Sequence, residues 1–288
     1  MLFRESSGEL SGDLCGMLRY EDINDISDGR LYGPDDLVMA GTSGCEGCSK
    51  CCESDMGHSI VLDPYDAYNL IKATGESFDQ LLTTFKIELS MIDTIVLPNL
   101  KMDKGCSFLK DGRCTIHQYR PGICRLFPLG RIYNDKGFDY FLQTKECALT
   151  EEKRNPVKVR DWLGIDNLEK NSNYINKWHR FIKFEKKKVA EKREMASHEI
   201  NRFKKIEKNS LRDYAHILGE DEKYEELGFR KYKESLINKE QTDSEEAVKA
   251  IIKTSLSCFY MEGYDVTKDF YEQFDERLKL CLGRLRKY

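Results

Sequence analysis

Residues 44–52 read G-C-E-G-C-S-K-C-C, so four cysteines fall within a run of eight positions. These are Cys45, Cys48, Cys51 and Cys52, and a wider set follows downstream: Cys106, Cys114, Cys124 and Cys147. The other three thiols are scattered along the chain, at Cys15, Cys258 and Cys281. Eight of the eleven cysteines therefore lie between residues 45 and 147, and this concentration predicts a metal site in that region.

The spacing of the first cysteines suits a metal with an affinity for sulfur. A C-x2-C turn presents two thiolates to one zinc or iron centre, and Cys51 extends the pattern to a third. Bacterial ferredoxin motifs open with the same spacing and continue with x3-C-P. Here Cys52 follows at once and no C-P occurs. That motif is not met, although an iron–sulfur cluster with a distant fourth ligand stays open.

The adjacent pair Cys51-Cys52 bears on how many centres form. Neighbouring side chains diverge on a strand or a helix, so we expect that one of the two serves a second centre or a neighbouring site. A helix would group positions 45, 48 and 52, whereas a ferredoxin-like loop would group 45, 48 and 51. In either case the downstream cysteines must contribute ligands. Eight thiols suit two four-ligand centres, or one cluster with additional thiols.

Other residues near the cysteines are weaker candidates. His117 follows Cys114 by three positions and is a candidate nitrogen ligand, and His58 is a weaker one. Arg120 and Arg125 flank Cys124, where they can balance the negative charge of a thiolate centre or pair with acidic residues of this half. The remaining histidines are expected on the surface of helices: His179, His198 and His216.

Turn and cap signals outline an α+β fold around these cysteines. Asp63-Pro64 predicts a helix that ends at Gly75, and Ser77 predicts the cap of a second helix. Residues 87–102 are typical of strand and loop. The segment 105–114 predicts a hairpin with its turn at Asp111-Gly112, and residues 131–142 predict another around 134–137.

Beyond residue 150 the chain is expected to be mainly helical. Aromatic and apolar residues at helical spacing form a core-facing stripe at Tyr174, Trp178, Phe181, Phe184 and Val189. Later helices are expected over 211–218, 244–260 and 268–286. We predict three parts: a loosely structured acidic lead-in over 1–43, a small cysteine-rich domain with short strands, hairpins and helices over 44–150, and a helical region over 151–288.

Charge argues against nucleic-acid binding as the main function. The net charge is −4; residues 1–150 carry 15 basic and 23 acidic residues, and residues 151–288 carry 31 and 27. The segment 177–208 has 12 basic and 5 acidic residues. We interpret it as a solvated helix face, with a surface for an acidic partner such as RNA as the alternative. The sequence has no apolar run of transmembrane length and no secretory start, so we expect a cytoplasmic protein with reduced thiols.

The cysteine segments resemble the CxxCxxCC cysteine-cluster family. The second segment, C-S-F-L-K-D-G-R-C-T-I-H-Q-Y-R-P-G-I-C-R-L-F-P-L, starts at residue 106 and carries R-P-x-x-C-R-x-F-P at 120–128. The resemblance covers residues 44–150 and implies binding of zinc or iron through eight characteristic cysteines. Flagellin lysine N-methylases, which use S-adenosylmethionine, are more distantly similar. Their cysteine spacing differs, and this sequence lacks a Gly-rich strand-to-helix turn for that cofactor.

We therefore predict a cytoplasmic protein that holds zinc or iron, with an iron–sulfur cluster included, through the eight clustered cysteines. Its biological role is undefined, and catalysis depends on whether one coordination position is open. Two alternative functions are also consistent with this sequence. One is an enzyme, either an S-adenosylmethionine-dependent protein lysine N-methyltransferase or a redox enzyme that works through the cluster. The other is an adaptor or nucleic-acid-binding protein that uses the basic helix 177–208.

Overall fold

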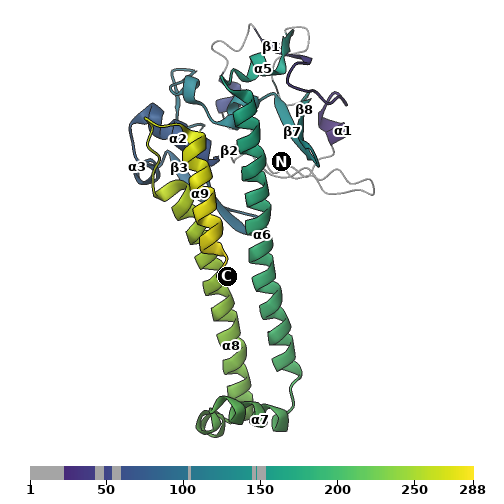
Figure 1. The fold of residues 1–288 in the computed structure, drawn as a ribbon, viewed down its shortest axis with the longest axis vertical. Coiled ribbons are helices and arrows are strands. Elements are labelled where there is room, and N and C mark those ends of the chain that lie inside the picture. The colour runs from purple at the N-terminus through teal and green to yellow at the C-terminus, as the bar shows by residue number, and fades with distance from the viewer. Residues whose placement is uncertain (1–22, 43–48, 54–59, 103–104, 145–146, 148–153) are drawn as a thin grey trace. The chain divides into compact units, whose positions relative to one another are not determined.

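The computed structural model describes residues 23–42, 49–53, 60–102, 105–144, 147 and 154–288 (Figure 1). Short antiparallel strands lie in the N-terminal part and long helices in the C-terminal part, which confirms the predicted α+β class. The strands are β1 (Leu37–Thr42), β2 (Ile60–Val61), β3 (Ile87–Ile92), β4 (Ile95–Leu100), β5 (Leu109–Lys110), β6 (Arg113–Cys114), β7 (Leu129–Asn134), β8 (Gly137–Leu142) and β9 (Arg154–Lys158). The helices are α1 (Ile23–Ile26), α2 (Pro64–Thr74), α3 (Phe78–Thr83), α4 (Gly122–Leu126), α5 (Val159–Leu163), α6 (Leu168–Lys205), α7 (Lys208–Leu218), α8 (Asp221–Leu256) and α9 (Phe270–Leu285).

The strands form small antiparallel sheets. β2, β4 and β3 make a three-stranded sheet in that order, and the pairs β5–β6 and β7–β8 are hairpins at the two predicted places. β1 pairs with β9, which joins two segments far apart in the sequence. Sequence analysis did not predict β1. Its residues 37–40 are apolar at every position, so the alternation of exposed Leu37 with buried Val38 is not visible as a pattern.

Helix α2 starts and ends, and helix α3 starts, where the caps in the sequence predict. Asp63 and Asp66 form a capping box at the start of α2, and Gly75 ends this helix in the left-handed conformation with φ of 70°. α3 begins with a second capping box, formed by Ser77 and Gln80. These two signals are local, because each depends on hydrogen bonds within three residues.

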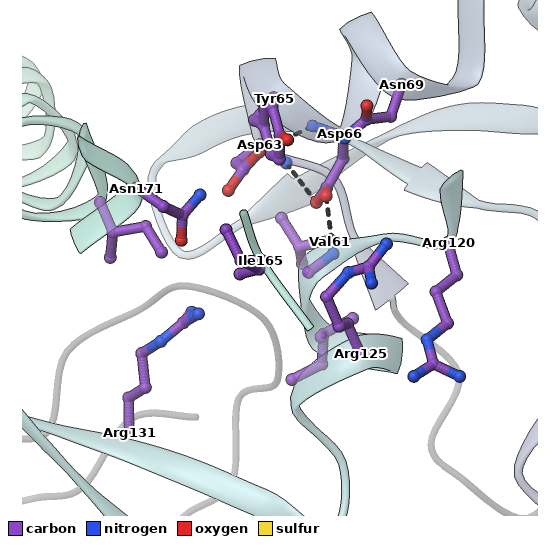
Figure 2. A pocket seen from close by; sticks show the side chains of 13 residues that line it. Val61, Asp63, Tyr65, Asp66, Asn69, Arg120, Arg125, Arg131, Ile165 and Asn171 are labelled. Atoms are coloured by element: carbon purple, nitrogen blue, oxygen red, sulfur yellow. Dashed lines mark hydrogen bonds between the residues drawn. The ribbon is translucent and has the colours of Figure 1, made fainter. Parts of the chain in front are cut away.

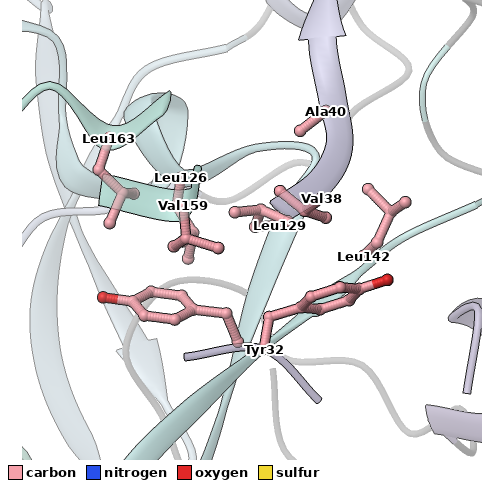
Figure 3. Close-up of a cluster of buried hydrophobic side chains, with 9 residues drawn as sticks. Tyr32, Val38, Ala40, Leu126, Leu129, Leu142, Val159 and Leu163 are labelled. Atoms are coloured by element: carbon pink, nitrogen blue, oxygen red, sulfur yellow. The ribbon is translucent and has the colours of Figure 1, made fainter. Parts of the chain in front are cut away.

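A hydrophobic core forms between the β7–β8 hairpin, β1 and two short helices (Figure 3). It joins side chains from β1, α4, β7, β8 and α5, together with Tyr32 from the loop before β1. Its buried members are Tyr32, Val38, Ala40, Leu126, Leu129, Tyr140, Leu142, Val159 and Leu163. Leu126 is 1% exposed and comes two residues after Cys124. The core therefore anchors the end of the short helix that carries a candidate ligand.

The chain forms two compact units. One takes its residues from 1–92, 96–182 and 256–280, and the other from 93–95, 183–255 and 281–288. The three-part division expected from sequence stays a prediction. In the first unit, the start of α6 packs on α9 through aromatic contacts such as Tyr174 with Phe274, whose ring centroids lie 4.6 Å apart. In the second unit α6 and α8 run side by side (Figure 1), and the Ser244 hydroxyl donates to the Lys192 carbonyl at 3.3 Å.

Two expectations for the helical part need correction. His179 is not a surface residue: it is 6% exposed and stacks on Tyr133 of β7 with ring centroids 3.7 Å apart. The start of α6 packs on the β7–β8 hairpin as well as on α9, so more than one stripe of this helix is buried. Phe184, expected in the core, is half-buried. No helix in the described part of the chain has the length and apolarity needed to cross a membrane.

Candidate metal centre

Backbone contacts bring two of the cysteine segments together. Cys51 and Cys52 lie in a 3₁₀ turn, Lys50–Cys52, and the carbonyl of Cys52 accepts a hydrogen bond from the N–H of Cys106 at 2.7 Å. Gly105 makes this approach feasible, because it has φ of 100° and a Cβ there would lie 3.2 Å from the Cys52 carbonyl oxygen. Residues 52 and 106, far apart in sequence, are therefore neighbours.

The second segment is the predicted hairpin. Leu109 pairs with Cys114, and Asp111 and Gly112 form the turn with φ of 51° and 72°. Both positive values are typical of a two-residue type I′ turn. Cys106 was expected on the first arm, but it lies before this arm, where its carbonyl accepts from Leu109 N at 2.9 Å. The hairpin thus presents Cys106 at its entry and Cys114 on its return.

The third segment is α4, which carries Cys124. Its first residue, Gly122, donates its N–H to the Asp66 carboxylate at 2.7 Å. The Arg125 guanidinium donates to the carbonyls of Gln118 at 2.7 Å and Leu163 at 3.4 Å. Arg125 was a candidate to face the thiols. In the structure, Arg125 uses these two hydrogen bonds to fix the backbone around the R-P-x-x-C-R-x-F-P motif.

Five described thiols influence one another electrostatically: Cys51, Cys52, Cys106, Cys114 and Cys124. Burial is the largest cause that raises the pKa of Cys106, Cys114 and Cys124, and neighbouring thiolates raise it further. For Cys124 the carboxylate of Asp66 adds to this effect. The structure therefore gathers thiols from three chain segments in a place that opposes their ionisation.

The vicinal pair behaves differently from the expectation. Cys51 and Cys52 were expected to diverge, but their side chains share a hydrogen bond. This bond lowers the pKa of Cys51 to about 6 and raises that of Cys52. Both side chains also interact with Cys106 and Cys124, so the turn directs the two sulfurs toward the same group of thiols.

Arg120 is the charge that faces this group. Its guanidinium lowers the pKa of both Cys51 and Cys114. It also lies 2.5 Å from Nε2 of His117. A guanidinium can only donate, so Nε2 accepts this bond and its lone pair is occupied. Burial, followed by Arg120 and Arg125, lowers the pKa of His117, which keeps the ring neutral.

Not all predicted ligands meet here. Cys45, Cys48 and His58 lie outside the described residues. Cys147 is a half-buried free thiol, and the described contacts do not link it to the other five. Among the residues that the structure describes, no three His, Cys, Asp or Glu side chains converge closely enough to hold a metal ion. The described thiols are thus neighbours without forming a complete ligand shell.

A small polar cavity lies between α2, α4 and the start of α6 (Figure 2). Asp63, Asp66, Arg120, Arg125 and Arg131 line it, and burial raises the pKa of both carboxyl groups. It leaves about 20 Å³ for the centres of water-sized molecules, room for one or two waters.

Sequence analysis did not single out either aspartate as a site residue. Asp63-Pro64 was interpreted as a helix start, and in the structure Asp63 and Asp66 form the capping box there. The long-range bond from Gly122 to Asp66 has no local signal, since 56 residues separate the two. The sequence shows only an acidic residue three positions after Asp63, which is typical of a capping box and does not indicate a contact with Gly122.

One of the comparisons with known proteins found a match. Residues 44–159 match the CxxCxxCC family model. The family is described as a "putative zinc- or iron-chelating domain", and the resemblance seen in the sequence is thereby confirmed. The CxxCxxCC region extends past residue 150 and so takes in β9, the partner strand of β1. Neither the search of curated proteins nor that of solved structures found a match.

The basic segment 177–208 makes several ion pairs with acidic residues. Lys177 pairs with Asp275 at 2.7 Å, and Lys186 pairs with Asp93 at 2.6 Å. Further pairs form within the helix, at Lys187–Glu191 and Arg202–Glu199. Part of the positive charge of this segment is therefore matched within the fold.

Proposed function

We propose that the CxxCxxCC region binds zinc or iron through cysteine thiolates. The candidate ligands are Cys45, Cys48, Cys51, Cys52, Cys106, Cys114, Cys124 and Cys147. The observation that carries the proposal is the gathering of five thiols from three chain segments, in which burial and mutual charge oppose ionisation. A bound cation removes this conflict, since a thiol that coordinates a metal is deprotonated.

The chemistry of the candidate ligands suits zinc or iron, because all eight are cysteines and both metals bind thiolate sulfur. Cys51 and Cys52 both interact with the same downstream thiols, and this supports one shared centre over two separate ones. Arg120 would compensate the negative charge of the thiolates. When bound, the metal would cross-link the three segments and, if it is an iron–sulfur cluster, carry an electron. His117 is a poor ligand while Arg120 occupies its Nε2.

The setting proposed for this protein is the cytoplasm, where free thiols stay reduced and available to a metal. Several basic residues of segment 177–208 pair with acidic residues of the fold, which gives no support to an RNA adaptor. Metal binding is therefore the function that the geometry supports best.

Anaerobic purification followed by elemental analysis tests the proposal. We expect bound zinc, or iron with a brown colour and visible charge-transfer absorption if a cluster forms. Cys124→Ser should lose most of the metal, whereas Cys281→Ala, which removes a fully buried thiol of α9, should retain it. Protein that carries no metal and whose clustered thiols all react freely with an alkylating reagent would refute the function.

A further inference from the structure

Asp66 is a buried carboxylate that is not among the proposed ligands. It is 3% exposed, and its two oxygens accept from two different backbone N–H groups (Figure 2). Oδ2 accepts from Asp63 N at 3.1 Å and so completes the capping box of α2. Oδ1 accepts from Gly122 N at 2.7 Å, in the segment that carries Cys124. One side chain thus joins α2 to the third cysteine segment.

The capping box alone does not explain a buried carboxylate. Gln80 plays the same part in α3, where its Oε1 accepts from Ser77 N at 2.7 Å, and it does so with a neutral, exposed side chain. A capping box therefore needs neither burial nor charge at this position. The bond to Gly122 is what distinguishes Asp66 from Gln80, and together with the Asp63 N–H and the charge of Arg131 it offsets part of the cost of burying this carboxyl group.

α4 is short, so both of its ends determine where Cys124 lies. The helix has five residues, with Gly122 at its start and Leu126 at its end. Leu126 is 1% exposed and is held in the hydrophobic core. Asp66 holds the start through Gly122. Cys124 stands between these two attachments, so a shift at either end displaces its sulfur.

We propose that Asp66 is a positioning residue for the metal centre. By accepting the Gly122 N–H it sets the position of the Cys124 sulfur against the thiols of residues 51–114. This inference rests on the metal binding proposed above. The essential property is an acceptor oxygen at the right place, and not the negative charge.

Three substitutions at one site separate these properties. Asp66→Ala removes both acceptor oxygens. Asp66→Asn keeps one carbonyl oxygen for Gly122 and removes the charge. Asp66→Glu keeps the charge but moves the oxygens by one methylene. Gln80→Ala is the matched control, because it deletes the equivalent capping-box acceptor of α3 away from the cysteines.

The readouts are the affinity for Zn²⁺, from competition with a chelator, and the thiolate-to-metal absorption of the Co²⁺-loaded protein, which reports how many thiolates coordinate. We expect about 10- to 100-fold weaker Zn²⁺ binding and a weaker Co²⁺ band for Asp66→Ala, as for losses of other outer-shell contacts. Asp66→Asn should restore most of both, Asp66→Glu should bind more weakly than Asp66→Asn, and Gln80→Ala should match the wild type.

Wild-type affinity and absorption in Asp66→Ala would overturn the positioning role and leave the proposed function standing. Equal losses in Asp66→Asn and Asp66→Ala would also overturn it, because an acceptor oxygen for Gly122 would then not be sufficient to position Cys124. If circular dichroism shows that Asp66→Ala is unfolded, the ranking of Asn above Glu carries the test, and the reverse ranking refutes the inference. A wild-type protein that binds no metal defeats the proposed function itself.

Discussion

Glu185 is a buried carboxyl group in α6 whose burial should cost the protein stability at neutral pH. It is 2% exposed, and its hydrogen bond with Ser255 of α8 compensates the burial only in part. Burial raises the pKa of Glu185 from 4.5 to about 8. The folded protein therefore keeps this group protonated at pH 7, whereas the unfolded chain ionises it.

The size and sign of the effect follow from this difference. The folded state binds the extra proton between pH 4.5 and about pH 8, so the free energy of unfolding falls as the pH rises through this range. At 1.36 kcal/mol for each pKa unit, the group costs about 3 kcal/mol at pH 7 relative to acid conditions. Glu185→Gln has no proton to release and should avoid this cost.

Urea unfolding of both proteins from about pH 5 to pH 7.5, followed by far-UV circular dichroism, measures the effect. The variant should gain stability over the wild type as the pH rises, from little difference at the acid end to about 3 kcal/mol at pH 7. Glu194→Gln makes the same change at an exposed position of α6 and should give a difference that does not vary with pH. A pH-independent difference for Glu185→Gln as well would refute the reasoning.

Three further predictions concern other parts of the molecule. Metal affinity should fall as the pH is lowered from about 8 to 6.5. Burial and neighbouring thiols raise the pKa of several cysteines, and the metal must displace their protons. Competition with a chelator measures this affinity, and pH-independent binding would contradict the prediction. Tyr260→Phe removes the hydrogen bond from its hydroxyl to the buried Leu62 carbonyl at 3.0 Å and should cost about 1–3 kcal/mol in urea unfolding; an unchanged midpoint would exclude a contribution from this bond. Gly130→Ala should lower the free energy of unfolding by about 1–3 kcal/mol or more, because its Cβ would lie 2.2 Å from the Phe141 ring. The control Gly283→Ala meets no atom within 4 Å and should be neutral or slightly stabilising. Equal melting temperatures of the two variants would contradict the predicted clash.

Local signals in the sequence were sufficient for much of the fold. Asp63-Pro64 and Gly75 predicted the bounds of α2, and Asp111-Gly112 predicted the turn between β5 and β6, because cap and turn energies depend on a few adjacent residues. The resemblance to the CxxCxxCC family could also be seen from local sequence, because the cysteine spacing at 45–52 and the motif at 120–128 are each contiguous. Residues 44–159 match the model of this family.

Contacts across the chain were decided by the tertiary structure. β1 lacks an alternating pattern and is a strand because β9 pairs with it. His179 is buried because β7 places Tyr133 against α6. The side chains of Cys51 and Cys52 meet through their turn, although adjacent side chains diverge on a regular helix or strand.

The stretch Gly44–Cys52 and the cysteines that follow it were enough, by themselves, to indicate a thiolate metal site of the CxxCxxCC type. The assembly of the three segments depends on bonds between residues far apart in the chain: Cys106 to Cys52, and Gly122 to Asp66. A backbone N–H carries no residue-specific signal, and its partner is determined only when the chain has folded. For this reason the sequence indicates which side chains favour a metal, and the fold determines which of them meet.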